Sequence, residues 1–177
     1  MAKFYRTSNE KLFNIPDFPY EDKYINNIKG FDDYKDIRMA YVDEGDNNSE
    51  LTFLMLHGSP TWSYLWRHFI KEIVDANYRA VALDMIGFGR SDKPLDEKAY
   101  TFESMRSSII NAIEQLDLKN VVLVVHEWGG FLGLTIPMEI RDRIEAIIIH
   151  NTILTTGNQL MSDSYSDWRK YISDNPD

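Results

Sequence analysis

The chain has 177 residues, a length that suits one domain, and its hydrophobic content of 44% is ordinary for a globular protein. Its 19 lysines and arginines are outnumbered by 28 aspartates and glutamates, and the formal charge of −9 disfavours a nucleic-acid partner because like charges repel. A chain without cysteine cannot form disulfides, thiolate metal sites or cysteine nucleophiles.

The first 20 residues mix aromatic side chains with two prolines and are interpreted as an extended arm. They lack the uninterrupted apolar stretch of a secretory signal. The longest apolar runs, 121–125 and 146–149, are far shorter than the roughly 20 residues that span a bilayer. We therefore expect a soluble, cytoplasmic protein without a membrane segment.

Predicted strands and helices alternate along the rest of the chain. The first two strands alternate polar and apolar residues, as in an antiparallel pair at a sheet edge, whereas the later four are nearly all apolar, as in strands covered on both faces. This order predicts βαβ units and a mostly parallel sheet with helices on both faces. The predicted strands are 23–28, 38–45, 51–56, 79–84, 121–125 and 145–150, and the predicted helices are 62–77, 101–118 and 129–139.

Two loops follow the predicted strands that end near residues 56 and 84. In "HGSPTWSYLWR" (57–67), Gly58 permits a tight turn, the Ser59–Pro60 bond is a candidate cis peptide, and the backbone N–H of Ser59 could face a substrate oxygen. A plain strand-to-helix turn remains the alternative. The loop "DMIGFGRSDKP" (84–94) matches a dinucleotide-binding motif poorly, and we interpret it as structural support for the first loop.

The third loop, in "VVLVVHEWGGFLG" (121–133), carries a carboxylate on a sharp turn between a strand and a helix. Such a turn lifts a nucleophile clear of the sheet and requires small neighbours, a place that Gly129 fills. A carboxylate there would attack carbon and displace a leaving group, forming an ester with the enzyme. Glu127 is therefore a candidate nucleophile; the alternative is a surface glutamate favoured by the dipole at a helix N-terminus.

Together the three loops resemble those of the haloalkane dehalogenases of the α/β-hydrolase superfamily. The resemblance implies that Glu127 is the nucleophile, that Trp128 and Trp168 bind the departing halide, and that the N–H groups of Ser59 and Trp128 form the oxyanion hole. It also implies an α/β-hydrolase fold truncated after the sixth strand: residues 1–157 as the N-terminal part of the core, and residues 158–177 as the incomplete start of a cap. A small halogenated alkane and a halide ion would be the ligands, without a metal or organic cofactor.

Two features depart from the family pattern. The family's nucleophile is aspartate, and the additional methylene of Glu127 moves the carboxylate by roughly 1 Å, a displacement that can cost about 100-fold in rate. The chain also ends at Asp177, inside the expected cap and before the family's acid and base; Asn151, where some branches place the acid, is uncharged. We assign structural roles to all four histidines, His57, His68, His126 and His150. We therefore expect impaired or absent turnover.

Three hypotheses remain open at this point. The first is a dehalogenase-like hydrolase, the second is an epoxide hydrolase that shares the carboxylate on its turn, and the third is a non-catalytic relative or fragment. Halide release separates the first from the third, and epoxide opening identifies the second. The strand 145–150 should form an exposed sheet edge, which favours self-association.

Overall fold

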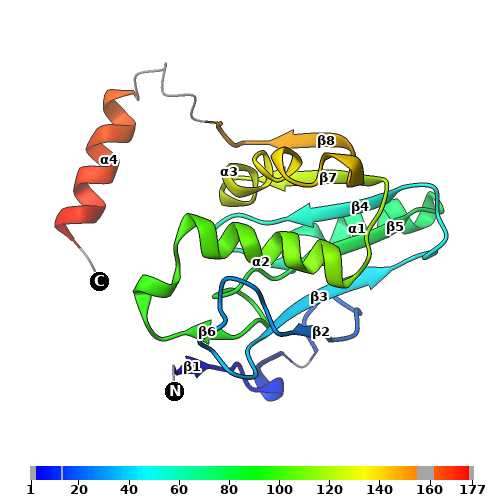
Figure 1. Ribbon diagram of the computed structural model, residues 1–177, viewed down its shortest axis with the longest axis horizontal. Helices are drawn as coiled ribbons and strands as arrows, with labels where there is room; N and C mark the ends of the chain where they lie inside the picture. Colours follow the sequence, from blue (N-terminus) through cyan, green and yellow to red (C-terminus); the bar gives the residue numbers. More distant parts are fainter. Residues whose placement is uncertain (1–2, 13, 155–161, 176–177) are drawn as a thin grey trace.

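The computed structural model describes residues 3–12, 14–154 and 162–175. A six-stranded sheet carries the fold, in the order β2-β3-β5-β4-β7-β8 (Figure 1). β2 and β3 run antiparallel to their neighbours, whereas β5, β4, β7 and β8 are parallel, so the predicted mostly parallel sheet with an antiparallel pair at its edge is confirmed. The strands are β2 (Lys23–Asn26), β3 (Arg38–Glu44), β4 (Thr52–Leu56), β5 (Arg79–Leu83), β7 (Val121–His126) and β8 (Ile144–His150).

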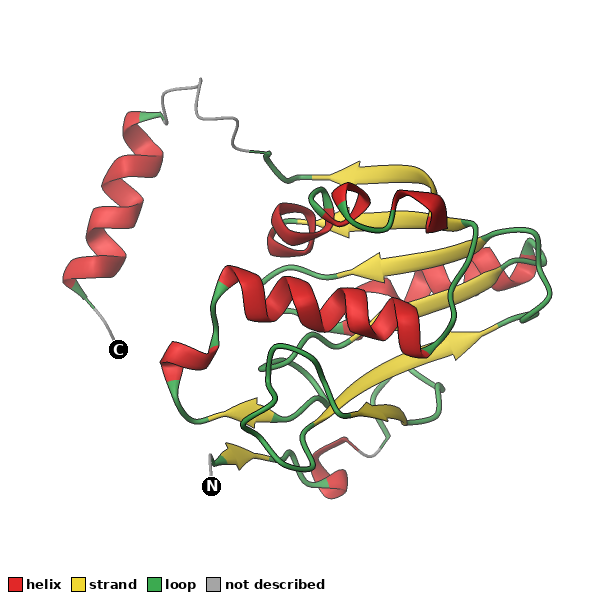
Figure 2. Cartoon of the chain, in the orientation of Figure 1, coloured by secondary structure: helices red, strands yellow, loops and turns green. Residues whose placement is uncertain are grey.

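Helices cover both faces of this sheet, as predicted (Figure 2). On one face, α2 (Phe102–Gln115) and α3 (Trp128–Gly133) pack on one set of alternating strand residues, which includes Leu54 and Leu123. On the other face, α1 (Arg67–Asp75) packs on the intervening residues, which include Met55 and Val124. Since successive side chains of a strand point to opposite faces, the nearly uninterrupted apolar runs are explained by burial on both sides.

The helix starts follow local capping rules, and one predicted helix is interrupted. Thr101 caps α2, because its side chain accepts from the backbone N–H of Ser104 and the Ser104 side chain accepts from the backbone N–H of Thr101. The predicted capped start of this helix is therefore confirmed. The single helix predicted over 129–139 was wrong, because α3 ends at Gly133 and a separate 3₁₀ turn, Ile136–Met138, follows. Pro137 has no N–H to donate to a helical carbonyl, which breaks the helix there.

Short elements complete the described chain. A small antiparallel sheet joins β1 (Phe4–Tyr5) in the N-terminal arm to β6 (Lys93–Pro94). Within the predicted helix 62–77, a 3₁₀ turn precedes α1. The 3₁₀ helices are Asn9–Leu12, Ser63–Trp66, Glu97–Ala99, Ile136–Met138 and Arg141–Arg143.

The C-terminal part of the described chain is the least covered. β8 lies at the edge of the sheet, and its residues 145–149 are exposed, so its predicted burial on both faces was wrong whereas its edge position agrees with the sequence. α4 (Asp163–Asp174) follows and contributes no buried residue. The predicted boundary between residues 157 and 158 lies outside the described residues.

Candidate active site

The turn at Glu127 joins the end of β7 directly to the start of α3. Glu127 has φ 49° and ψ −117°, a left-handed backbone conformation that non-glycine residues adopt at a cost of about 1–3 kcal/mol. The turn also passes close to β4: a Cβ atom at Gly129 would overlap the carbonyl oxygens of Leu56 and His57. The small residue that the sequence predicted beside the turn is therefore required by the approach of a neighbouring strand.

Two backbone N–H groups converge on one carboxylate oxygen of Glu127. Oε2 accepts from the N–H of Ser59 at 2.8 Å and from the N–H of Trp128 at 2.6 Å. Within the described part of the chain, Oε1 accepts no hydrogen bond. A Cβ atom at Gly58 would overlap Oε2, so the absence of a side chain there lets the 57–67 loop approach the carboxylate. The longer glutamate side chain thus reaches both N–H groups that the sequence predicted to act together.

The backbone of the turn is tied to the end of β8 as well. The carbonyl oxygen of Glu127 accepts from the hydroxyl of Thr152 at 2.7 Å, and from the N–H groups of Gly130 and Phe131 at 2.9 and 3.0 Å. Thr152 was not singled out from the sequence. Thr152 lies just beyond the carboxyl end of a parallel strand, where open α/β sheets place their ligand sites. This position in the sequence could have identified it as a candidate.

A buried ion pair fixes the loop that carries Ser59. Asp84 accepts from the backbone N–H of Ser63 at 3.0 Å, and from the backbone N–H and Nε of Arg90 at 2.8 and 3.0 Å. Burial by itself lowers the pKa of Arg90, but attraction to Asp84 and Asp22 outweighs burial and raises that pKa. The predicted supporting role of the 84–94 loop is consistent with these contacts.

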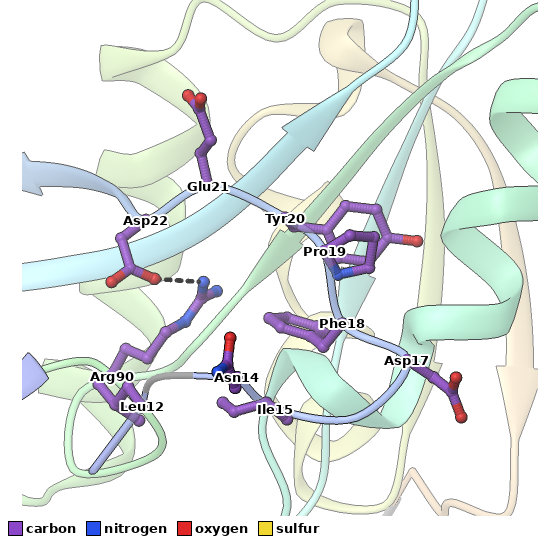
Figure 3. A pocket seen from close by; sticks show the side chains of 10 residues that line it. All are labelled: Leu12, Asn14, Ile15, Asp17, Phe18, Pro19, Tyr20, Glu21, Asp22 and Arg90. Carbon is purple, nitrogen blue, oxygen red and sulfur yellow. Dashed lines mark hydrogen bonds and ion pairs between the residues drawn. The ribbon is translucent and has the colours of Figure 1, made fainter. Parts of the chain in front are cut away.

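Arg90 also connects the core to the N-terminal arm. Its Nη1 donates to Asp22 at 3.0 Å, beside a cavity of about 600 Å³ between the arm and Arg90 (Figure 3). Its guanidinium lies over the rings of Phe18 and Trp62, at 5.1 and 5.5 Å from their centroids. All three guanidinium nitrogens of Arg90 have partners in the protein, Nη2 donating to Ser63 Oγ, so this cavity offers a ligand no free cation from Arg90.

A second cavity, of about 940 Å³, opens over Glu127. The side chains that α4 contributes recur at helical spacing, so one stripe of this helix faces the cavity. Trp128 and Trp168, the two predicted halide ligands, both line it, and they are 48% and 55% exposed. The remaining lining residues are Phe131, Asn151, Thr152, Ile153, Tyr165, Arg169, Ile172 and Ser173.

The four histidines occupy different environments. Both ring nitrogens of His57 are engaged: Nδ1 contacts the carbonyl oxygen of Gly58 at 2.8 Å, and Nε2 accepts from the N–H of Met85 at 3.0 Å. Burial lowers the pKa of His57. His68 is exposed on α1. His150 packs against the rings of Trp66 and Phe69, and His126 places Nδ1 toward Gly58. None of these side chains hydrogen-bonds to Glu127 in the described structure.

The described residues contain no group of three or more histidine, cysteine, aspartate or glutamate side chains placed to hold a metal ion. None of their helices combines the length and the apolar character that crossing a membrane requires.

A mostly parallel sheet that carries a carboxylate on a strained turn between a strand and a helix, within reach of two backbone N–H groups, is typical of the α/β-hydrolase fold. A model of the alpha/beta hydrolase fold family matches residues 52–176. A haloalkane dehalogenase from Psychrobacter cryohalolentis is 34% identical over 98% of this chain and 56% of its own length. The chain belongs to the α/β-hydrolase family and is a haloalkane dehalogenase-like member of it.

Solved structures of two kinds of enzyme share this fold. Haloalkane dehalogenase DpaA from Paraglaciecola agarilytica NO2 superposes with a TM-score of 0.91 at 46% identity, covering 99% of this chain and 57% of that one. An epoxide hydrolase from Vigna radiata superposes with a TM-score of 0.63 at 30% identity, covering 72% of this chain and 37% of that one. The chain thus spans little more than half the length of the dehalogenases that it matches.

Proposed function

We propose that this chain cleaves a carbon–halogen bond by nucleophilic substitution, with Glu127 as the nucleophile. A lone pair of Oε1 attacks the halogen-bearing carbon, the new C–O bond forms as the C–X bond breaks, and the halide leaves with the bonding electrons. The product is an alkyl ester of Glu127, and no proton is transferred in this step. Water then releases the alcohol in the complete reaction of the dehalogenase family.

The observation that carries this proposal is the asymmetry of the two carboxylate oxygens. Oε2 is fixed by two N–H donors, whereas Oε1 accepts no hydrogen bond within the described residues, and Glu127 lines the cavity. After alkylation, Oε2 becomes the ester carbonyl oxygen and keeps the same two donors. Attack on that ester carbon would place negative charge on Oε2, where preorganised donors are worth most. This arrangement supports an oxyanion-hole role for the N–H groups of Ser59 and Trp128.

The halide leaving group would bind between the two tryptophans that line the cavity, Trp128 and Trp168. An indole N–H stabilises a halide as negative charge develops on it, and charge that appears only in the transition state is where such donors accelerate a reaction. The indole of Trp128 belongs to the residue next to the nucleophile, and Trp168 comes from α4. The mainly aromatic and aliphatic lining fits a small halogenated alkane, and the step itself requires no cofactor.

Intact mass spectrometry after incubation with 1-bromohexane tests the proposal. We expect either a mass increase of one hexyl group that maps to Glu127, or continuing release of bromide. The Glu127→Gln variant, which has no anionic nucleophile, should show neither. A folded wild-type chain that gives no adduct and no bromide would refute the proposal and favour the non-catalytic hypothesis.

Epoxide opening is the second candidate, and one observation favours it. Tyr165 lines the same cavity as Glu127, and a phenol O–H in that cavity could donate to the oxygen that an opening epoxide releases. The likeness to a solved epoxide hydrolase agrees with this chemistry. Incubation with 1,2-epoxyhexane decides the matter: an adduct on Glu127 that is lost in Tyr165→Phe supports epoxide opening, and no adduct excludes it.

We also propose that the exposed edge of β8 mediates self-association. Ile147, Ile148 and Ile149 are 36–55% exposed on a seven-residue strand that carries neither lysine nor proline, the residues that normally protect such edges. The similar dehalogenase DpaA has a tetrameric structure. Light scattering should detect oligomers that Ile148→Lys reduces, whereas a clean monomer of the wild-type chain would contradict this proposal.

A further inference from the structure

Thr152 connects two segments that are far apart in the sequence. It follows β8 and Asn151, and its hydroxyl donates to the carbonyl oxygen of Glu127 across 25 positions of the chain at 2.7 Å. The same side chain packs tightly on Gly130, where an added Cβ atom would overlap the Cβ, Cγ2 and Oγ1 of Thr152. Both contacts fall on the turn that presents the nucleophile.

The peptide that accepts this hydrogen bond also determines where the Glu127 carboxylate lies. The carbonyl of Glu127 and the N–H of Trp128 belong to one planar unit, so fixing the carbonyl fixes the direction of the N–H that holds Oε2. The turn has a left-handed φ of 49°, a conformation that persists only where its surroundings constrain it. In the first turn of α3 the carbonyl also accepts from two N–H groups, but Thr152 is the donor that lies outside this turn.

We propose that Thr152 is a positioning residue for the nucleophile, which it holds through the Glu127 carbonyl. This inference rests on the function proposed for Glu127. The hydroxyl of Thr152 anchors the Glu127–Trp128 peptide to the end of β8, and the packing of its methyl group on Gly130 sets the distance. A loosened peptide would let Oε2 and Oε1 shift together relative to the cavity.

The test compares three variants. Thr152→Val keeps the branched shape and removes the hydroxyl, and Thr152→Ser keeps the hydroxyl and removes the methyl group. Thr135→Val is the control, because Thr135 also donates a hydroxyl hydrogen bond of 2.7 Å to a carbonyl, that of Leu132, and has no hydrogen bond to Glu127. Its hydroxyl oxygen also accepts from Nε of Arg106 at 3.1 Å, so this variant loses one hydrogen bond more than Thr152→Val does. Each protein is measured for the single-turnover rate of hexyl transfer from 1-bromohexane and for amide exchange at Gly130 and Phe131.

We expect Thr152→Val to alkylate about 10-fold more slowly, because displacements well below 1 Å already reduce the rate of an oriented reaction. Exchange at Gly130 and Phe131 should rise by a similar factor, Thr152→Ser should restore most of both readouts, and Thr135→Val should change neither. A merely structural role would lower the melting temperature and raise exchange throughout the core, while leaving the alkylation rate of the folded protein unchanged; that result would overturn the inference.

The two proposals fail in distinguishable ways. If the wild-type chain forms no adduct and releases no bromide, the function proposed for Glu127 is refuted, and amide exchange alone then decides the role of Thr152. Faster exchange confined to the turn in Thr152→Val would still support positioning of this peptide. Unchanged exchange there would refute it, whatever the chemistry of Glu127.

Discussion

Replacing Asp84 with alanine should destabilise this protein more than any surface substitution, because it leaves a buried cation without its main partner. The side chains of Asp84 and Arg90 are 0% and 1% exposed, and Asp84 accepts three hydrogen bonds from Ser63 and Arg90. Breaking a buried pair by removing one member costs about 3–5 kcal/mol. Arg90 keeps Asp22, whose side chain is 38% exposed, so we expect the lower part of that range, about 3 kcal/mol.

Urea unfolding measures this loss. A domain of this size has a slope of about 1–3 kcal/mol per M of urea, so a loss of about 3 kcal/mol lowers the midpoint by about 1–3 M. The same variant frees the backbone N–H of Ser63 and with it the loop that carries Ser59. The rate of Glu127 alkylation should therefore be lower in the variant than in the wild-type chain, even without urea, where the variant is folded.

Two controls isolate the buried pair. The double variant Asp84→Ala/Arg90→Leu removes both charges, and we expect it to be more stable than Asp84→Ala alone, because no unpaired charge remains buried. Asp75→Ala breaks an exposed ion pair, in which the side chain of Lys71 is 66% exposed and that of Asp75 is 58% exposed. This variant should lower the free energy of unfolding by at most about 0.5 kcal/mol. A midpoint for Asp84→Ala that equals that of Asp75→Ala would refute the reasoning.

Three further predictions concern the turn and its supports. Gly129→Ala should cost about 1–3 kcal/mol in urea unfolding, since the new methyl group meets the carbonyls of Leu56 and His57; an unchanged midpoint would contradict this. Burial lowers the pKa of His57, so the unfolded state binds the proton more readily than the folded state does. The contribution of neutral His57 to the free energy of unfolding should therefore be fully present above about pH 6.5 and should be lost as the pH falls below that value. The variant His57→Gln should reduce this loss. Glu127→Asp, which has the shorter side chain of the family's nucleophile, should be alkylated about 100-fold faster, a difference of about 2.7 kcal/mol in the activation free energy. Equal rates would show that glutamate does not impair the reaction.

The sequence predicted the layers of this protein because burial on two faces leaves a direct signature. Nearly uninterrupted apolar runs mark β4, β5 and β7, and the polar and apolar alternation of β2 and β3 marks the antiparallel edge. The same signature failed for β8, whose isoleucines are exposed, since composition reports what a strand can bury and not which neighbour covers it. Pro137 indicated that the helix would be interrupted after Gly133, but the helical spacing of the apolar residues favoured one continuous helix over 129–139.

The candidate site was less accessible to sequence reasoning, because it depends on contacts between distant segments. Glu127, Ser59 and Trp128 were found from their loops, and the structure brings their atoms to within 2.8 Å. Thr152 and Tyr165 have no comparable motif. Thr152 acts through a hydrogen bond to a backbone carbonyl, which any threonine could make, and Tyr165 lies on α4, whose placement over the cavity no local pattern specifies.

The supports of the turn explain how the chain presents a glutamate where its family has an aspartate. The end of β4 approaches Gly129, the end of β8 supplies Thr152, and the Asp84 network holds the loop that carries Ser59. Each support acts on backbone rather than on the Glu127 side chain, so none of them depends on its length. The N–H groups therefore stay in place, and the longer arm needs only to fold back for Oε2 to reach them. Under the proposed function, we expect the additional methylene to change the position of Oε1 within the cavity. The alkylation rate, and not the stability, is therefore the quantity that should separate glutamate from aspartate.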